Sequence, residues 1–266
     1  MVRRPLGNHH HGPDTFLVTS DTTRTDPMAA ETGRLRELIT GARFVLFDFD
    51  GPICRLFAGH SAELVSQDMM DWLERQGLLW QLTQEERSQP DPYVLLPMMD
   101  ARHRGSDLVA AMEERLTQQE LRAVVSAQPT AYADPLIRTW AALGARLAIT
   151  SNNSARAVSA YLKSRGLVDC FAPHIYGRTR ELHRQKPDPH HLIRALRAMG
   201  AAGETALMIG DSPSDLQAAE QAGVPFLGYA RNERKQKLLR AAGAEVVVSA
   251  LEPVLRVLRD DVGRTR

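Results

Sequence analysis

Four short apolar runs recur along the chain, and each stops at a cluster of polar or turn-forming residues. They cover residues 44–47, 147–150, 206–209 and 246–248, with a shorter candidate at 226–228. A short apolar run closed by a turn signal is typical of a strand that helices cover on both faces. These runs therefore predict the strands of a buried sheet.

Helical patterns fill the gaps between these runs. Three helices are predicted to begin with an N-cap residue followed by proline, at Asp134-Pro135, Asp188-Pro189 and Ser212-Pro213. The spacing of residues 249–252 predicts a capping box ahead of a last helix. Strands that alternate with helices predict an α/β fold, a Rossmann-like parallel sheet with right-handed crossovers and helices on both faces.

Residues 56–129 interrupt this alternation because they contain no convincing strand. Helices are predicted over residues 60–76 and 106–116, and residues 117–120 have the spacing of a cap for a third helix. Pro129 marks the return to the sheet. We therefore expect an α-helical subdomain inserted directly after the first strand.

Residues 1–34 show no sustained periodicity, and we expect a flexible leader that ends at a short helix over residues 35–40. His9, His10 and His11 are adjacent within it. Three neighbouring histidines in a flexible tail have no second shell of hydrogen-bond partners to orient them for a metal. A solvated tail is the favoured interpretation.

Composition excludes several classes of protein. The chain has 266 residues, of which 43% are hydrophobic, and a net charge of +1 from 33 basic and 32 acidic residues. This balance gives no overall attraction to nucleic acid or to an anionic membrane. No apolar run approaches the roughly 20 residues of a membrane-spanning helix. With only two cysteines and no signal-peptide pattern, we expect a cytoplasmic protein.

Two carboxylates follow the first predicted strand. Asp48 and Asp50 lie two residues apart, so in an extended segment both side chains leave on the same side. Carboxylates this close favour a divalent cation, or they divide the roles of nucleophile and acid/base. A polar turn with no chemical role explains them equally well on this pattern alone.

Polar residues also end the later strands, at the edge where open parallel sheets bind ligands. Ser151 and Asn152 offer a hydroxyl and backbone N–H groups to a phosphate oxygen, although a plain helix N-cap explains Ser151 equally well. Lys186 precedes a predicted helix; a surface charge is the usual role of a lysine, yet the chain has only four lysines, which points to a need for a compact point charge there. Asp211 and Asp215 supply hard oxygen ligands suited to Mg²⁺.

These motifs, in this order, resemble those of the haloacid dehalogenase-like (HAD) hydrolase superfamily, of the phosphatase type with a C1 helical cap. The resemblance covers roughly residues 43–250. It implies a HAD-like α/β core formed by residues 35–55 and 130–260, with residues 56–129 as the helical cap.

The resemblance also implies a role for each motif. Asp48 would be the nucleophile that forms an aspartyl-phosphate, and Asp50 the general acid and base. Mg²⁺ would be bound by Asp48, Asp50 and Asp211, with Asp215 steadying the metal shell or pairing with Lys186. The phosphoryl oxygens would be bound by Ser151, the Asn152 N–H and Lys186.

Within the superfamily, Asp50 separates the possible activities. Dehalogenase members lack a carboxylate there, and phosphonatase members need a cap lysine, whereas the first lysine here is Lys163. The expected function is therefore a Mg²⁺-dependent phosphatase of a small phosphate ester, acting as a monomer or homodimer. A phosphomutase and a non-catalytic protein that binds a phosphate ligand are the alternatives.

The chain departs from the family pattern directly after Asp50. Pro52 removes an N–H from the turn, and Arg55 stands where an acidic residue is frequent. Polar candidates for substrate specificity in the cap are Arg55, His60, Arg102, His103, Arg104 and Arg115. We expect the cluster around His103 to be the one that affects substrate choice.

Overall fold

The structure is a computed structural model that describes residues 27–89 and 91–264. The histidine triplet at residues 9–11 lies outside the described residues. So does most of the segment expected as a flexible leader.

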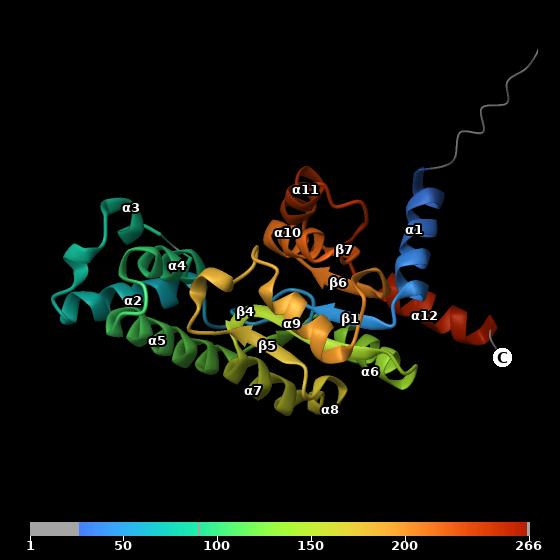
Figure 1. Cartoon of the computed structure of the whole chain (residues 1–266), viewed down its shortest axis with the longest axis horizontal. Coiled ribbons are helices and arrows are strands. Elements are labelled where there is room, and N and C mark those ends of the chain that lie inside the picture. Colours follow the sequence, from blue (N-terminus) through green and yellow to red (C-terminus); the bar gives the residue numbers. More distant parts are fainter. Residues whose placement is uncertain (1–26, 90, 265–266) are drawn as a thin grey trace, which may run out of the picture.

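A six-stranded parallel sheet forms the centre of the molecule (Figure 1). Its order is β5-β4-β1-β6-β7-β8, and all five neighbouring pairs are parallel. The strands are β1 (Phe44–Phe47), β4 (Arg146–Ser154), β5 (Ile175–Arg178), β6 (Ala206–Gly210), β7 (Phe226–Tyr229) and β8 (Val247–Val248). Each predicted apolar run overlaps a strand, which confirms the α/β class.

The edge strand β5 was not predicted. Its sequence, Ile-Tyr-Gly-Arg, contains no continuous apolar run because it pairs only with β4, and Ile175 and Tyr176 are only partly buried. β4 also continues to Ser154, four residues beyond the predicted run. Its polar end becomes part of the site described below.

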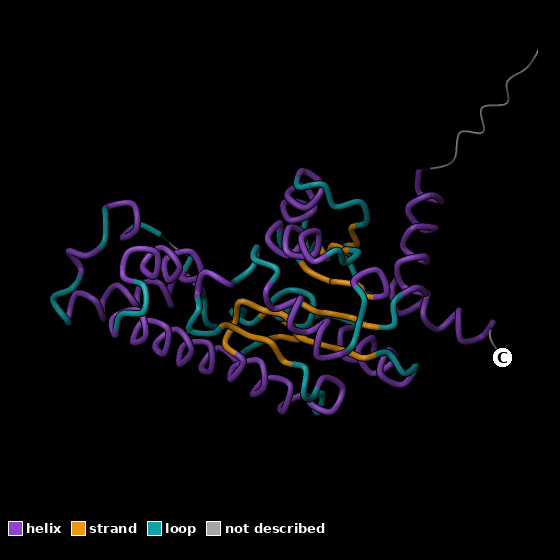
Figure 2. Tube along the Cα trace, viewed as in Figure 1, coloured by secondary structure: helices purple, strands orange, loops and turns teal. Residues whose placement is uncertain are grey.

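Helices cover both faces of the sheet, as Figure 2 shows in purple around the orange strands. Alternate residues of β1 point to opposite faces. Val45 and Phe47 belong to the apolar cluster that includes α1, α6, α7 and α12, whereas Leu46 packs with α9 and α10. The bounds are α1 (Pro27–Gly41), α6 (Ala133–Ala142), α7 (Ala155–Arg165), α8 (Val168–Phe171), α9 (His190–Met199), α10 (Pro213–Ala222), α11 (Glu233–Ala241) and α12 (Glu252–Arg264).

Helix α1 begins at Pro27, eight residues before the predicted start at Leu35, so the expected leader 1–34 is too long. The buried side chains of Leu35 and Ile39 join the main core, and α1 packs on α12. These two residues lie in the later turns of the helix. Residues 31–34 of α1 are polar or glycine, which explains why the sequence showed no helical periodicity just before Leu35.

Residues 56–129 form a helical segment with its own apolar cluster, at the end of the sheet opposite α1 and α12 (Figure 1). It leaves and rejoins the core through a short antiparallel pair, β2 (Cys54–Arg55) and β3 (Gln128–Pro129). Its helices are α2 (Ala62–Arg75), α3 (Gln84–Arg87), α4 (Pro92–His103) and α5 (Asp107–Val124). Single turns of 3-10 helix occur at Leu79–Gln81, Leu182–Arg184 and Gly203–Thr205.

Three predicted N-cap residues were wrong: Thr117, Asp134 and Asp188. Thr117 does not begin a third helix, because α5 continues through it and its hydroxyl donates a hydrogen bond to Glu113 Oε1 at 3.0 Å. Asp134 does not cap α6, since Tyr132 is the N-cap, with φ of 65°, and Asp134 instead pairs with Arg165.

The starts of α9 and α10 each contain a proline. Asp188 is not the predicted N-cap of α9, because Pro189 takes that position, and Asp188 instead accepts a hydrogen bond from the His190 N–H. Ser212 caps α10 as predicted. Among the described residues, no helix is long and apolar enough to cross a membrane.

Candidate active site

A polar cavity of about 250 Å³ lies at the carboxyl ends of β1, β4 and β6. The structure brings all seven predicted site residues to its wall: Asp48, Asp50, Ser151, Asn152, Lys186, Asp211 and Asp215. They come from parts of the chain up to 167 residues apart, and the parallel sheet places them together because its strand ends share one edge. Sequence reasoning missed Asp91, Tyr93, Asn153 and Lys235, which also line the cavity.

Lys186 joins the two carboxylates on either side of it. Its Nζ donates to Asp48 Oδ1 at 2.7 Å, to Asp215 Oδ1 at 2.5 Å and to the Thr150 carbonyl at 2.9 Å. Burial acts to lower the pKa of Lys186, but Asp215 and Asp48 outweigh it, so the pKa is raised and the ammonium stays charged. The three donors of Nζ are all used, which fixes the charge at the end of β1.

Asp48 is almost completely buried, and burial raises its pKa to about 6, an effect that Lys186 partly opposes. Only one of its carboxylate oxygens, Oδ1, pairs with Lys186. Asp48 is therefore an anionic oxygen donor held at the floor of a small cavity, the arrangement that a nucleophile or a metal ligand requires.

Asp50 has its carboxylate fixed from the start of the helical segment. Its Oδ1 accepts a hydrogen bond from the Leu56 N–H at 2.9 Å, and burial raises its pKa. The turn between Asp48 and Asp50 continues into Gly51, whose φ is +136°. A Cβ there would collide with Asp211 Oδ2, so glycine is what lets the turn approach the Asp211 carboxylate.

Asp215 organises the loop between β6 and α10. Its Oδ2 accepts hydrogen bonds from the N–H groups of Asp211 and Ser212 and from the Ser212 hydroxyl, while Oδ1 pairs with Lys186. A Cβ at Gly210 would collide with the Asp215 Cβ. Both oxygens of Asp215 are engaged, which favours pairing with Lys186 as its role over direct contact with a metal.

The acidic residues fit a divalent cation. Asp48, Asp211 and Asp215 each offer an oxygen within 4.8 Å of the others. Burial raises the pKa of Asp211 to about 7, and Lys235, from the first turn of α11, pairs with its Oδ2. Clustered buried carboxylates need a compensating charge, and hard oxygen donors suit Mg²⁺. The rarity of lysine could have identified Lys235 from the sequence, because it is another of the chain's four lysines.

Residues 151–154 are the last part of β4, where its pairing with β5 shifts register, and they include the predicted phosphate ligands Ser151 and Asn152; we name this segment the phosphate-binding loop. The Asn152 side chain exchanges two hydrogen bonds with the backbone of Lys186, at 2.8 and 3.0 Å. The Ser151 hydroxyl donates to Asn153 Oδ1 at 2.9 Å. Helix α7 is capped by Ser154, so Ser151 is not an N-cap, and Ser151 is one of the residues that line the cavity.

The helical segment reaches the cavity through α4 and not through the expected arginines and histidines. Asp91 and Tyr93 line it. The predicted cluster around His103 lies at the far end of α4 and does not reach the cavity, which corrects that expectation. The other polar candidates mostly hold the segment together, in the pairs Arg55–Gln128, His60–Gln119, Arg102–Glu86 and Arg115–Asp68.

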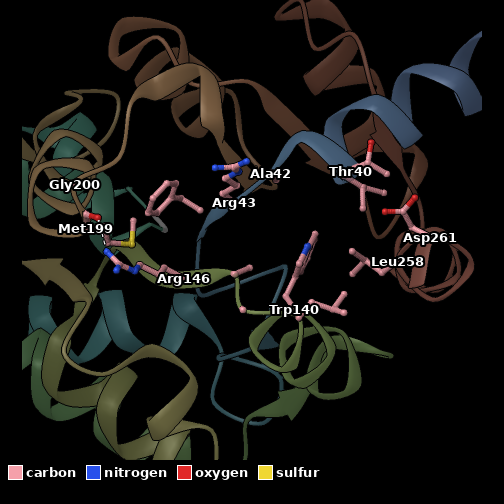
Figure 3. Close-up of a pocket in the computed structure, with 14 residues that line it drawn as sticks. Thr40, Ala42, Arg43, Trp140, Arg146, Met199, Gly200, Leu258 and Asp261 are labelled. Atoms are coloured by element: carbon pink, nitrogen blue, oxygen red, sulfur yellow. Dashed lines mark hydrogen bonds between the residues drawn. The ribbon is translucent and has the colours of Figure 1, made fainter. Parts of the chain in front are cut away.

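A larger cavity of about 810 Å³ lies at the opposite edge of the sheet, where β1 and β4 begin (Figure 3). Arg43, Trp140, Arg146 and Met199 are among its lining residues, and Asp261 is the one carboxylate among those that the structure describes. No cluster of carboxylates and no lysine occurs among its described lining residues. The chemistry therefore points to the smaller cavity.

Comparison with known proteins agrees with this site. A family model described as haloacid dehalogenase-like hydrolase matches residues 42–223. The phosphoglycolate phosphatase of Rhodospirillum rubrum is 38% identical over 100 residues, 36% of this chain and 41% of that protein. The phosphoglycolate phosphatase of Thiobacillus denitrificans is 35% identical over 127 residues, 46% of this chain and 54% of that protein. The chain thus spans about half the length of these relatives.

Solved structures show the same fold. CbbY from Rhodobacter sphaeroides, solved in complex with phosphate, has a TM-score of 0.56 and 20% identity, over 79% of this chain and 94% of that one. A haloacid dehalogenase-like family protein from Streptococcus pneumoniae has a TM-score of 0.54 and 16% identity, over 85% and 100% of the two chains. With the matched family model spanning more than half of its residues, the chain belongs to the haloacid dehalogenase-like hydrolase family.

Proposed function

We propose that the protein is a Mg²⁺-dependent phosphatase that hydrolyses a small phosphate monoester through an aspartyl-phosphate at Asp48. The observation that carries the proposal is the position of Asp48, paired through one oxygen with Lys186 in a cavity that also holds Asp50 and Asp211. Nucleophile, acid/base and phosphate-binding cation are then within one small space.

In the first step, an Asp48 carboxylate oxygen attacks phosphorus and the bond from phosphorus to the ester oxygen breaks. Asp50 donates its proton to that oxygen, which leaves as an alcohol. Burial raises the pKa of Asp50, which favours the protonated form that this step requires. The charged ammonium of Lys186 would offset the negative charge of the phosphoryl oxygens, and the Ser151 hydroxyl would exchange its hydrogen bond to Asn153 Oδ1 for one to a phosphoryl oxygen.

In the second step, Asp50, now ionised, takes a proton from a water molecule that attacks phosphorus. The bond between phosphorus and the Asp48 oxygen breaks, inorganic phosphate forms, and Asp48 returns to a carboxylate. One residue thus serves as acid and then as base, and no other proton donor is needed.

Asp48, Asp211 and the Asp50 carbonyl are the groups that would hold Mg²⁺. When bound, the ion would offset the repulsion between an anionic nucleophile and an anionic phosphate. Binding of Mg²⁺ would release Asp211 from Lys235, because the ion and the ammonium group would compete for the same carboxylate.

The names of the relatives suggest 2-phosphoglycolate as the first substrate to assay. A cavity of about 250 Å³ suits a substrate of that size better than a polymer. The two cysteines, Cys54 and Cys170, are both free thiols, which is consistent with the expected cytoplasmic location.

The test is release of inorganic phosphate from 2-phosphoglycolate, an aryl phosphate and a panel of sugar phosphates, with Mg²⁺ and with EDTA. Wild type is compared with Asp48→Asn and with Asp169→Asn, the same chemical change at an exposed aspartate of α8. We expect metal-dependent release that Asp48→Asn lowers at least about a thousandfold and Asp169→Asn leaves intact.

Two results would contradict the proposal. Full activity in Asp48→Asn would exclude Asp48 as the nucleophile. Isomerised sugar phosphate with little free phosphate would indicate a phosphomutase instead.

A further inference from the structure

A second buried ion pair lies beside the phosphate-binding loop. The side chains of Arg178 on β5 and Glu120 on α5 are both 0% exposed. Arg178 Nη1 donates to Glu120 Oε1 at 2.8 Å, and Nη2 donates to Oε2 at 3.1 Å. A buried pair of this kind gains little over apolar packing because both charges lose their hydration. Its other contacts indicate what it does.

Those contacts go to three consecutive residues of the loop. Glu120 Oε2 accepts from the Ser154 N–H at 3.0 Å, and Oε1 accepts from Asn153 Nδ2 at 3.3 Å. Arg178 Nη1 also donates to the Asn152 carbonyl at 3.1 Å. The ion pair therefore fixes the loop at each of its last three residues.

Asn153 connects the ion pair to Ser151 at the proposed phosphate site through hydrogen bonds. Its Nδ2 donates to Glu120, and its Oδ1 accepts from the Ser151 hydroxyl at 2.9 Å. The Asn153 N–H donates back to the Ser151 oxygen at 3.2 Å. The orientation of Ser151 thus depends on Asn153, and that of Asn153 on Glu120.

Glu120 itself belongs to the helical segment, and a second helix of that segment contacts its carboxylate. The Tyr93 hydroxyl on α4 donates to Glu120 Oε1 at 2.7 Å and accepts a hydrogen bond from Asn153 Nδ2. Tyr93 lines the cavity. Loop and helical segment therefore meet at one buried anion.

We propose that Glu120, held by Arg178, is a positioning residue that orients the phosphate-binding loop and docks Tyr93 of the helical segment beside it. The inference rests on the proposed function, because it requires the loop to bind phosphoryl oxygens. A role in stability alone would not connect Glu120 to phosphate affinity.

The test measures the affinity of the full-length protein for inorganic phosphate in the presence of Mg²⁺ by calorimetry. It also measures kcat and KM for an aryl phosphate, all below the melting temperature of each variant. Asn153→Ala removes the link between Glu120 and Ser151 while leaving the ion pair in place. Glu120→Gln removes the charge that orders the loop.

Thr117→Val is the matched control. The Thr117 hydroxyl accepts a hydrogen bond from Arg178 Nη2 at 2.9 Å and is buried, but it makes no hydrogen bond to the loop. Its loss weakens the surroundings of the ion pair without touching residues 151–154.

We expect Asn153→Ala to raise the Kd for phosphate and the KM about tenfold, with a smaller change in kcat, since the phosphate contacts lose their orientation. Glu120→Gln is expected to match or exceed this. Tyr93→Phe is expected to raise the KM about threefold, because the bonds between ion pair and loop remain. Thr117→Val is expected to stay within about twofold of wild type in phosphate affinity while melting at a lower temperature.

Phosphate affinity unchanged in both Asn153→Ala and Glu120→Gln would overturn the inference and leave the pair a structural one. If Glu120→Gln does not fold, Asn153→Ala decides the question, because the buried pair is intact in it. Failure of the proposed function would look different, since the wild type would then bind no phosphate in competition with substrate and Asp48→Asn would remain active.

Discussion

The two edges of the sheet carry cavities of opposite character. The one at the amino ends of β1 and β4 holds about 810 Å³ and is lined by apolar groups, arginines and one carboxylate. The one at the carboxyl ends holds about 250 Å³ and is lined by five aspartates, two lysines and the phosphate-binding loop. Size therefore does not identify the site in this molecule, and the clustering of reactive groups does.

The topology explains the difference. At the carboxyl edge the chain leaves each strand into a turn whose side chains are free to converge on a ligand. At the amino edge the polar groups serve the backbone, as when Arg146 Nη1 donates to the Met199 carbonyl at 2.9 Å. Arg43 lies at the same edge, where its carbonyl accepts from the Arg146 N–H. The following variants test the contrast between the two edges.

The largest effect is expected from Asp50→Asn at the carboxyl edge. Loss of the general acid and base should lower kcat by about 10² to 10⁴. The loss should be smaller for an aryl phosphate with an acidic leaving group, which needs less help from a proton. Steady-state assays of both substrate types check this, with Arg43→Gln as the amino-edge control expected within about twofold of wild type. An equal loss in the two variants would contradict the contrast.

A pH effect is expected from α9, which runs from the neighbourhood of Lys186 to the larger cavity. The ring nitrogens of His191 are buried with no hydrogen-bond partner in the described part of the chain, and burial, reinforced by Lys186, lowers its pKa to about 4 from 6.5. Ordinary unfolded histidine binds a proton below about pH 6.5, whereas the folded form does not until about pH 4. The stability that neutral His191 contributes is therefore complete above pH 6.5 and is lost as the pH falls toward 4.

The loss amounts to about 3 kcal/mol over that range. Urea unfolding of wild type and of His191→Leu at pH 7 and pH 4.5 measures it. The difference between the two proteins should change with pH in favour of the variant at pH 4.5, and it isolates His191 from the carboxylates that titrate in the same range. A constant difference would show that His191 is not the group responsible.

Metal binding should stabilise the protein through the carboxyl edge only. At a free Mg²⁺ concentration of 100 times its Kd, the gain in unfolding free energy is about 2.7 kcal/mol. Thermal melts with and without Mg²⁺ measure it. Asp211→Asn should abolish the gain, whereas Asp261→Asn, at the amino-edge cavity, should keep it. A gain that persists in Asp211→Asn would remove Asp211 from the metal site.

The smallest effect is expected at the amino edge. Trp140 is 1% exposed and packs edge-on against Phe47, with ring centroids 5.8 Å apart. Trp140→Phe should lower the free energy of unfolding by about 1–2 kcal/mol, because it shortens a buried side chain. It should leave kcat/KM unchanged. Denaturation and steady-state assays on the same sample test this. A loss of activity without a loss of stability would indicate that the larger cavity has a role in catalysis, which would contradict the contrast between the two edges.

Much of the fold could be predicted from the sequence because each buried parallel strand is a short continuous apolar run. The runs at residues 44–47 and 206–209 are apolar throughout, since both faces of those strands are covered. The edge strand β5 has no continuous apolar run, because one of its sides has no neighbouring strand. Helix α5 was divided at Thr117 since the local spacing of a capping box is also compatible with the middle of a helix.

The site was predictable to the extent that its residues follow apolar runs. Asp48, Asp211 and Ser151 each follow a recognisable apolar run, directly or after one glycine. Glu120 and Arg178 had no such marker, because their pairing depends on the position of an unpredicted strand against a helix 58 residues earlier in the chain. Tyr93 was missed for the same reason, since its contact with the cavity depends on how α4 packs.

The most direct test of the central claim is to trap the phosphorylated enzyme. Wild type is mixed with labelled 2-phosphoglycolate, or with the best substrate of the panel, quenched in acid within one turnover and digested for peptide mapping. We expect a phosphoryl group on the peptide that contains Asp48 and none on that peptide in Asp48→Asn. Complete turnover with no labelled protein, or a label on a peptide without Asp48, would contradict it.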